Sequence, residues 1–260
     1  MSKKAIERYG MQFPSEWNSL EIELHCMKIN VTPEHGGLGQ VGHFRNVVDI
    51  IWNRPDSPKP FLWHPWAVKM IEYAFKYPEL AIAGCAGSGK SDCMAVYGIV
   101  QYLASPDDTI VLFTSTSLKD SKKRVWGTVV EYWNAAPGLP GQLAKSLGII
   151  RGADGSEKKG RALIAGEKKH EKEAVGKLIG FHNRRVFLIA DELSELSEAI
   201  LEAAYGNLSA NPHFEFKGMS NPLSHHDPFG RMAKPKLGWE AVNDEMDDWE
   251  TERGWCVRFD

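Results

Sequence analysis

Short apolar runs alternate with amphipathic stretches along most of the chain, and this alternation predicts an α/β fold. Apolar runs of a few residues between turn-forming residues predict buried strands, and apolar residues three and four apart predict helices. The predicted strands cover residues 80–83, 109–114, 161–165, 186–190, 214–219 and 255–259. The predicted helices cover residues 42–52, 65–77, 91–103, 119–133 and 197–205.

Strands that alternate with helices predict right-handed βαβ units and a mostly parallel sheet. Such a sheet is covered on both faces, which explains why the strand segments are apolar throughout. Residues 1–60 are interrupted by proline and glycine and predict an irregular arm with one helix, ahead of a domain over 61–260. The helix that begins at Pro65 is expected to place Trp66, Met70, Tyr73 and Ala74 on one face, and residues 138–160 predict a loop or hairpin.

A glycine-rich segment between a predicted strand and helix matches the phosphate-binding pattern G-x-x-x-x-G-K-[ST]. Glycines at this spacing let successive backbone N–H groups converge on phosphate oxygens, and the following helix presents its positive end to the same anion. The lysine is expected to reach the β- and γ-phosphates and the serine hydroxyl to bind Mg²⁺. The residues are Gly84, Cys85, Ala86, Gly87, Ser88, Gly89, Lys90 and Ser91.

The apolar segment 186–190 ends in two adjacent acids, Asp191 and Glu192. Ligands of open α/β sheets bind where strands end, so Asp191 can hold Mg²⁺ through water and Glu192 can act as general base for an attacking water. This pair favours the branch of phosphate-loop hydrolases that carries a catalytic glutamate. The alternative is a simple helix N-cap, since acids also favour that position.

A third polar strand end follows the segment 214–219. Ser220 and Asn221 are candidates to sense the γ-phosphate or the attacking water, although Ser-Asn-Pro is also a common turn. His225, His226 and Asp227 lie between prolines and predict a polar loop rather than a metal site. The acidic run over 244–252 predicts an exposed helix or linker.

Composition narrows the class of protein. The chain has 260 residues and a net charge of -3, without a long apolar segment or a secretory leader, so neither a membrane span nor secretion is expected. Its four cysteines show no zinc spacing and are expected to be reduced and mostly buried. The near-zero charge hides a gradient, because residues 117–185 hold 15 Lys and Arg against 7 Asp and Glu, whereas the C-terminal end is acidic. DNA therefore remains a possible partner.

Together, GCAGSGKS, TSTSLKDSKKRVWG, IGFHNRRVFLIADELSE and GMSNP resemble the large terminase subunit of tailed bacteriophages, the motor that packages viral DNA. The resemblance implies a RecA-like phosphate-loop ATPase that uses ATP and Mg²⁺. It also implies contacts of His64 and Trp66 with adenine, and a coupling role for Ser220 and Asn221. The partners implied are double-stranded DNA, the portal protein, the small terminase subunit and further copies in a ring on the procapsid, in the cytoplasm of the infected bacterium.

Two departures from the family pattern stand out. The loop over 84–91 lacks the basic residue that many members carry, so an activating arginine must come from elsewhere; the candidates are Arg124, Arg184 and Arg185, unless they are solvated charges. The usual C-terminal nuclease is not expected within this chain. Alternative functions are another nucleic-acid translocase, such as a helicase, and a nucleotide-dependent assembly protein with little hydrolysis.

Overall fold

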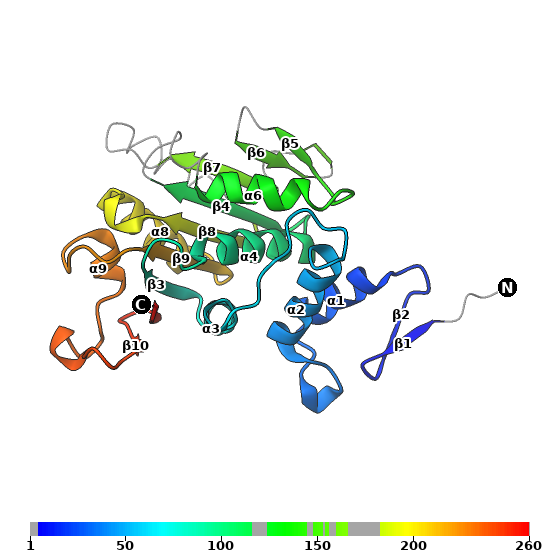
Figure 1. Ribbon diagram of the computed structural model, residues 1–260, viewed down its shortest axis with the longest axis horizontal. Coiled ribbons are helices and arrows are strands. Elements are labelled where there is room, and N and C mark those ends of the chain that lie inside the picture. The colour runs from blue at the N-terminus through cyan, green and yellow to red at the C-terminus, as the bar shows by residue number, and fades with distance from the viewer. Residues whose placement is uncertain are drawn as a thin grey trace.

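A nine-stranded sheet forms the centre of the computed structural model, which describes residues 5–115, 124–144, 148–152, 154–155, 160–165 and 183–259 (Figure 1). The strand order is β10-β11-β3-β9-β8-β4-β7-β6-β5. The strands are β3 (Glu79–Gly84), β4 (Thr109–Ser115), β5 (Gln142–Ala144), β6 (Ile149–Arg151), β7 (Gly160–Ala165), β8 (Arg185–Asp191), β9 (Phe214–Ser220), β10 (Asp248–Glu250) and β11 (Trp255–Phe259).

The strands from β11 to β7 in this order are parallel to their neighbours, so their carboxyl ends share one edge of the sheet. Strands β10, β6 and β5 extend the sheet in antiparallel fashion at its two margins. This confirms the prediction of an α/β fold with a mostly parallel sheet. Strand β9 lies between β3, which precedes the glycine-rich loop, and β8, which ends in the two acids.

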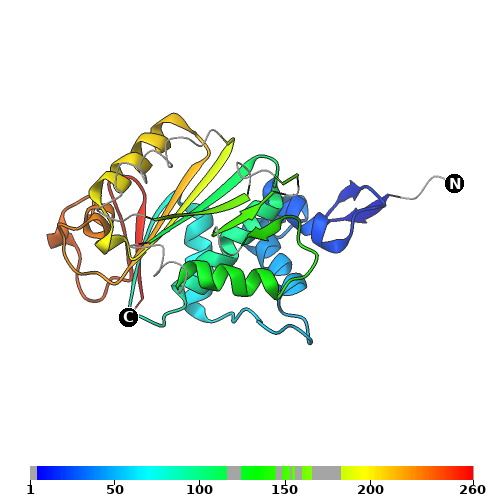
Figure 2. The same cartoon turned by 90° about the horizontal axis from the view of Figure 1, so that it is seen from above.

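Helices cover both faces of the sheet, as Figure 2 shows. One core cluster joins α4 and the helices beside it to the sheet, and a second joins α8 and α9 to the opposite face. The helices of the first face are α1 (Ser19–Lys28), α2 (Gly39–Ile51), α3 (Pro65–Lys76), α4 (Lys90–Ala104) and α6 (Val125–Asn134), and those of the second are α8 (Glu198–Ala210) and α9 (Pro228–Met232). Short 3₁₀ turns are η1 (Pro33–His35), η4 (Leu193–Glu195) and η5 (Trp239–Ala241).

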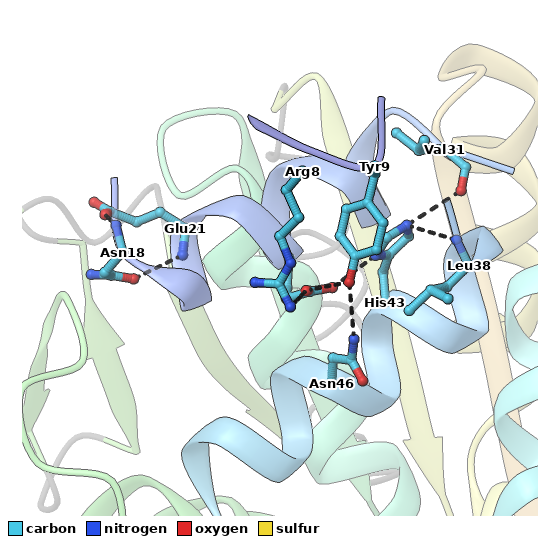
Figure 3. Close-up of polar contacts among 9 residues, drawn as sticks. Arg8, Tyr9, Asn18, Glu21, Val31, Leu38, His43 and Asn46 are labelled. Carbon is cyan, nitrogen blue, oxygen red and sulfur yellow. Dashed lines mark hydrogen bonds and ion pairs between the residues drawn. The ribbon is translucent and has the colours of Figure 1, made fainter. Parts of the chain in front are cut away.

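The N-terminal region is more regular than its sequence predicts. It forms the hairpin β1 (Ile6–Arg8) and β2 (Met11–Phe13) together with α1 and α2, and only α2 was expected. Helix α1 begins with a capping box, in which Glu21 N–H donates to Asn18 and Asn18 N–H donates to the Glu21 carboxylate (Figure 3). The division of the chain at residue 60 stays a prediction.

A buried polar network ties the hairpin to both N-terminal helices. The Glu23 carboxylate of α1 contacts His43 Nδ1 at 2.8 Å, accepts a hydrogen bond from Tyr9 Oη at 2.7 Å and pairs with Arg8 at 2.9 Å. Figure 3 shows Asn46 below Tyr9, where it donates to the tyrosine hydroxyl. Burial by itself raises the pKa of Glu23, but hydrogen bonds from His43 and Tyr9 outweigh it and lower the pKa.

The acidic C-terminal run was predicted as an exposed helix or linker, and this is wrong. Part of it is strand β10, which pairs with β11 at the edge of the sheet. Asp248 accepts hydrogen bonds from Tyr73 Oη and Trp255 Nε1, each at 2.9 Å, and pairs with Lys69 at 3.3 Å. Trp249 is buried. Burial of this side chain and the specific partners of Asp248 therefore hold the segment against the sheet, although most of its residues are polar.

Several boundaries also differ from the predicted ones. Helix α6 covers only Val125–Asn134, and residues 119–123 of the predicted helix lie outside the described residues. On the predicted apolar face of α3, Met70 and Ala74 are buried, whereas Trp66 is 47% exposed. The antiparallel pair β5 and β6 confirms the expected hairpin within 138–160. No helix in the described part of the chain has the length and apolar character needed to cross a membrane.

Candidate nucleotide-binding site

The loop after β3 has the backbone geometry of a phosphate-binding loop. Gly87 and Gly89 have φ values of 83° and 77°, in the left-handed region that glycine adopts without strain. A Cβ atom added to Gly89 would lie 2.9 Å from His64 Nε2, so a side chain there would also collide. Helix α4 begins immediately afterwards at Lys90, and the unpaired N–H groups of its first turn form an anion site.

The Lys90 side chain folds back onto its own loop. Its ammonium donates hydrogen bonds to the carbonyl oxygens of Gly84 at 2.6 Å and Cys85 at 2.8 Å, and to Ser88 Oγ at 3.2 Å. Burial lowers the pKa of Lys90, while the nearby carboxylates of Glu192 and Asp191 act in the opposite direction. The loop therefore holds a partly desolvated cation whose carbonyl partners a phosphate group can replace.

Asp191, the last residue of β8, carries a carboxylate that is buried but incompletely satisfied. It is 5% exposed, and its Oδ2 atom has no hydrogen-bond partner among the described residues. Burial raises its pKa to about 6, the neighbouring Glu192 adds to this, and Arg124 and Lys90 partly offset it. A buried oxygen without a partner is costly, so this position is suited to an ion or a bound water.

Magnesium fits this set of residues. No group of three or more His, Cys, Asp or Glu side chains that could enclose a metal occurs in the described part of the chain. Mg²⁺ usually needs no such group, because it takes one or two protein oxygens, keeps several waters and takes the rest from substrate phosphates. The free Asp191 oxygen and the hydroxyl of Ser91, in the first turn of α4, would supply the protein ligands.

Glu192 has an unusual backbone and a specific partner. Its φ and ψ of 52° and 48° are left-handed, a strained conformation for a residue with a side chain. Its carboxylate forms an ion pair with Arg124 at 2.9 Å, from the residue that precedes α6. Both side chains are partly exposed, so solvent can reach this pair. The structure thus brings one of the three candidate arginines to the acidic strand end.

The other two candidate arginines lie at the far end of the sheet. Arg185 begins β8, six residues before Asp191, which separates the two by about 20 Å of extended chain. Its guanidinium donates hydrogen bonds to Gln101 and Thr109, at distances of 2.6 to 3.1 Å. Arg185 therefore lies away from the acidic strand end of its own chain, and so does the exposed Arg184; an activating role of either one in a neighbouring subunit stays a prediction.

The residues proposed to couple the site to movement lie on the neighbouring strand. Ser220, at the end of β9, is buried, and its Oγ lies 2.6 Å from Ser194 Oγ and accepts a hydrogen bond from Ser194 N–H. Ser194 lies two residues after Glu192, so this contact links two strand ends directly. Asn221 is exposed. Sequence reasoning missed Ser194, because a serine in a turn carries no recognisable signal.

The two residues expected beside adenine lie near the loop but in different settings. His64 caps α3, since its Nδ1 accepts the Ala67 N–H at 3.2 Å, and its Nε2 faces Gly89. Trp66 is exposed and packs obliquely against Phe259 of β11, with ring centroids 5.9 Å apart. Contact of either residue with adenine stays a prediction.

The two histidines and the aspartate after β9 belong to a loop, as expected. Asp227 caps α9 by accepting the Gly230 N–H at 2.7 Å, and His225 stacks on Trp239 with ring centroids 4.0 Å apart. Of the cysteines, Cys26, Cys93 and Cys256 are buried free thiols, whereas Cys85 is exposed in the loop.

Strand order and site together define a class. A glycine-rich loop runs from β3 into α4, an acidic pair ends β8, and an additional strand lies between them. This is the RecA-like phosphate-loop fold of the branch with an additional strand and an aspartate–glutamate pair at the end of the strand beside it.

Comparison with known proteins supports this fold at the structural level. No protein-family model and no curated protein matches the sequence. A solved large terminase from a thermophilic bacteriophage is similar, with 10% identity and a TM-score of 0.51 over 64% of this chain and 41% of that chain. The large-terminase ATPase domain of Thermus phage P74-26 is also similar, with 16% identity and a TM-score of 0.50 over 63% of this chain and 66% of that chain.

At these identities the likeness shows a shared fold. The chain also spans only about two fifths of the length of the first of these structures.

Proposed function

We propose that this chain is the ATPase domain of a phage terminase large subunit, which hydrolyses ATP to drive double-stranded viral DNA into a procapsid. The carrying observation is the buried Asp191 oxygen that has no partner among the described residues, at the strand edge that also holds the phosphate loop. A glycine-rich turn that binds nothing would leave this acid unexplained. The likeness in fold to large-terminase ATPase domains supports the choice of motor.

The residues of this chain divide the reaction among them. The backbone N–H groups over 84–91 hold the phosphates, and Lys90 exchanges its carbonyl partners for the β- and γ-phosphate oxygens. Ser91 and Asp191 would hold Mg²⁺, which neutralises phosphate charge when bound. Glu192 accepts the proton of the water that attacks the γ-phosphate.

Arg124 is the activating residue that this geometry favours. In the structure it neutralises Glu192, and its exposed guanidinium can turn toward the charge that develops on the transferred phosphoryl group. Its departure would also free the Glu192 carboxylate to act as a base. One arginine would thereby link the arrival of the γ-phosphate to activation of the water.

Ser220, Ser194 and Asn221 provide a route from this site to moving parts. Because Ser194 lies next to the base and bonds to β9, a change around Glu192 would reach the end of β9 through a single contact. The partners proposed are double-stranded DNA, portal protein, small terminase subunit and further copies of the chain in a ring, in the cytoplasm of the infected bacterium. They rest on the likeness to large terminases, and much of the basic segment 117–185 lies outside the described residues.

The proposal is tested by ATP turnover with and without double-stranded DNA. We expect DNA to raise the rate of phosphate release, and Lys90→Ala to abolish turnover and weaken ATP binding by tenfold or more. Lys28→Ala is the matched control, since Lys28 donates a hydrogen bond to Ser105, at the opposite end of α4 from the loop. Unchanged nucleotide affinity in Lys90→Ala would refute the assignment of residues 84–91 as a phosphate-binding loop. ATP turnover that does not change when DNA is added would favour an ATPase with another function.

A further inference from the structure

Three buried oxygens at the carboxyl edge of the sheet have no hydrogen-bond partner among the described residues. They are Thr114 Oγ1, Ser115 Oγ and Asp191 Oδ2. Thr114 and Ser115 end β4 and are completely buried. A buried hydroxyl or carboxylate oxygen is normally hydrogen-bonded, so unsatisfied oxygens that lie on one face of the sheet indicate that something else binds there.

The register of the sheet places Ser115 beside Asp191. Strands β4 and β8 are parallel neighbours with Thr114 opposite Ala190, so the next positions along them are Ser115 and Asp191. Neighbouring strands are about 4.8 Å apart, which is the spacing that one shared water can bridge.

The two side chains also share a face of the sheet. Phe113 and Ile189, two residues earlier on each strand, belong to the core cluster that contains α4, the helix after the phosphate loop. The period of two along a strand puts Ser115 and Asp191 on that same face. Thr114 falls on the other face, whose core cluster contains Leu112 and Ala190.

We propose that Ser115 is a positioning residue of the magnesium site, whose hydroxyl holds a metal-bound water beside Asp191. This inference rests on the proposed function and adds a residue to it. Mg²⁺ retains several waters in its shell, and each needs a partner with a free lone pair or proton. Ser115 offers both, because a hydroxyl donates once and accepts twice. The hydroxyl orients a water and takes no proton from substrate.

The test measures metal binding separately from turnover. Mn²⁺ replaces Mg²⁺, and its affinity for the protein–ADP complex is measured from the electron paramagnetic resonance signal of free Mn²⁺. We expect Ser115→Ala to weaken Mn²⁺ binding about tenfold, the effect of losing one hydrogen bond to a charged site. ADP affinity in EDTA should stay within twofold of the wild type, and ATP turnover should fall because less metal is bound.

Two further variants separate this role from packing. Thr114→Val removes the adjacent buried hydroxyl from the other face and should leave Mn²⁺ affinity within twofold, whereas Ser115→Thr keeps the hydroxyl and should retain most of it. If Ser115→Ala does not fold, Ser115→Cys provides the same comparison with a weaker hydrogen-bonding group. Mn²⁺ affinity unchanged in Ser115→Ala, or equally reduced in Thr114→Val, would overturn the inference alone. A wild-type chain that binds no ADP would overturn the proposed function with it.

Discussion

Two acids of this protein, Glu23 and Asp191, are both buried, but they differ in how far hydrogen bonds and ion pairs satisfy their carboxylates. Glu23, in the N-terminal region, is completely buried and contacts Tyr9, His43 and Arg8, which together lower its pKa. Asp191, at the end of β8, is almost as buried, but one of its oxygens has no partner among the described residues and its pKa is raised to about 6. The two acids differ in what surrounds them rather than in depth.

The difference in hydrogen-bond partners suggests a structural role for Glu23 and a ligand-binding role for Asp191. The network around Glu23 is complete without any ligand, so its free energy is available to hold the hairpin against α1 and α2. The buried Asp191 carboxylate instead costs stability when it is ionised, and the cation that we propose at this site would relieve that cost. Each prediction below changes one side of this comparison.

The largest effect is expected from Asp191→Asn. Turnover of ATP should fall by about a hundredfold or more, because the amide binds a metal shell far less well than a carboxylate does. The free energy of unfolding should stay the same or rise, since no charge is buried in the variant. Phosphate release and urea denaturation check the two halves, and a marked loss of stability would mean that Asp191 is a structural acid.

Glu23→Gln is expected to do the reverse. The amide keeps one acceptor oxygen but loses the charge and puts an NH2 donor in place of the second oxygen, so Arg8 and His43 lose part of their pairing and stability should fall by about 2–4 kcal/mol. Turnover per folded molecule should remain within twofold of the wild type. Glu21→Gln, in the capping box of the same helix, is the control and should cost about 1 kcal/mol or less. Equal losses of stability in Glu21→Gln and Glu23→Gln would mean that the network around Glu23 adds no particular stability.

A pH series sharpens the comparison further. The raised pKa of Asp191 means that the folded state holds its proton more tightly than the unfolded state, so its contribution to stability is present at low pH. This contribution is lost as pH rises from about 4 to about 6. Wild type should therefore lose about 2–3 kcal/mol relative to Asp191→Asn over this range, and nothing further above it. Denaturation of both proteins at pH 4 to 7 provides the measurement; a constant difference would contradict the shift.

The smallest changes in stability are expected from the two arginine variants. Arg185→Met should lower stability by about 1–2 kcal/mol, because it strips hydrogen bonds from Gln101 and Thr109, and should leave the turnover of folded protein nearly unchanged. Arg124→Met should leave stability within about 0.5 kcal/mol, as its ion pair is partly exposed, but should reduce turnover. Thermal denaturation together with an ATPase assay distinguishes the two. The opposite pattern would return Arg185 to the site.

The elements of the parallel sheet could be predicted from sequence because strands buried on both faces are continuous apolar runs. The phosphate loop was recognisable because its chemistry constrains consecutive residues. Helix α1 was not predicted because Leu20, Ile22 and Leu24 alternate with polar residues instead of recurring at helical spacing, although the Asn18–Glu21 pair is a recognisable N-terminal signal. Strand β10 was not predicted because its segment is mostly acidic and contains a single buried apolar residue, Trp249.

Contacts between side chains of distant segments could be predicted only as a choice among candidates, such as the three arginines. Arg185 seemed close to the acids in sequence, but an extended strand carries it to the opposite edge of the sheet. Arg124 lies 68 residues before Glu192 and nevertheless contacts it. The Ser115–Asp191 juxtaposition likewise follows from strand register, which apolar patterns leave undetermined.

The central claim is that the strand edge around Glu192 hydrolyses ATP. Its most direct test is single-turnover hydrolysis by Glu192→Gln, a change that keeps the shape and removes the base. The account predicts that MgATP binds within about threefold of its wild-type affinity while the rate of hydrolysis falls by a factor on the order of 100 or more. Hydrolysis at the wild-type rate, with MgATP bound, would contradict it.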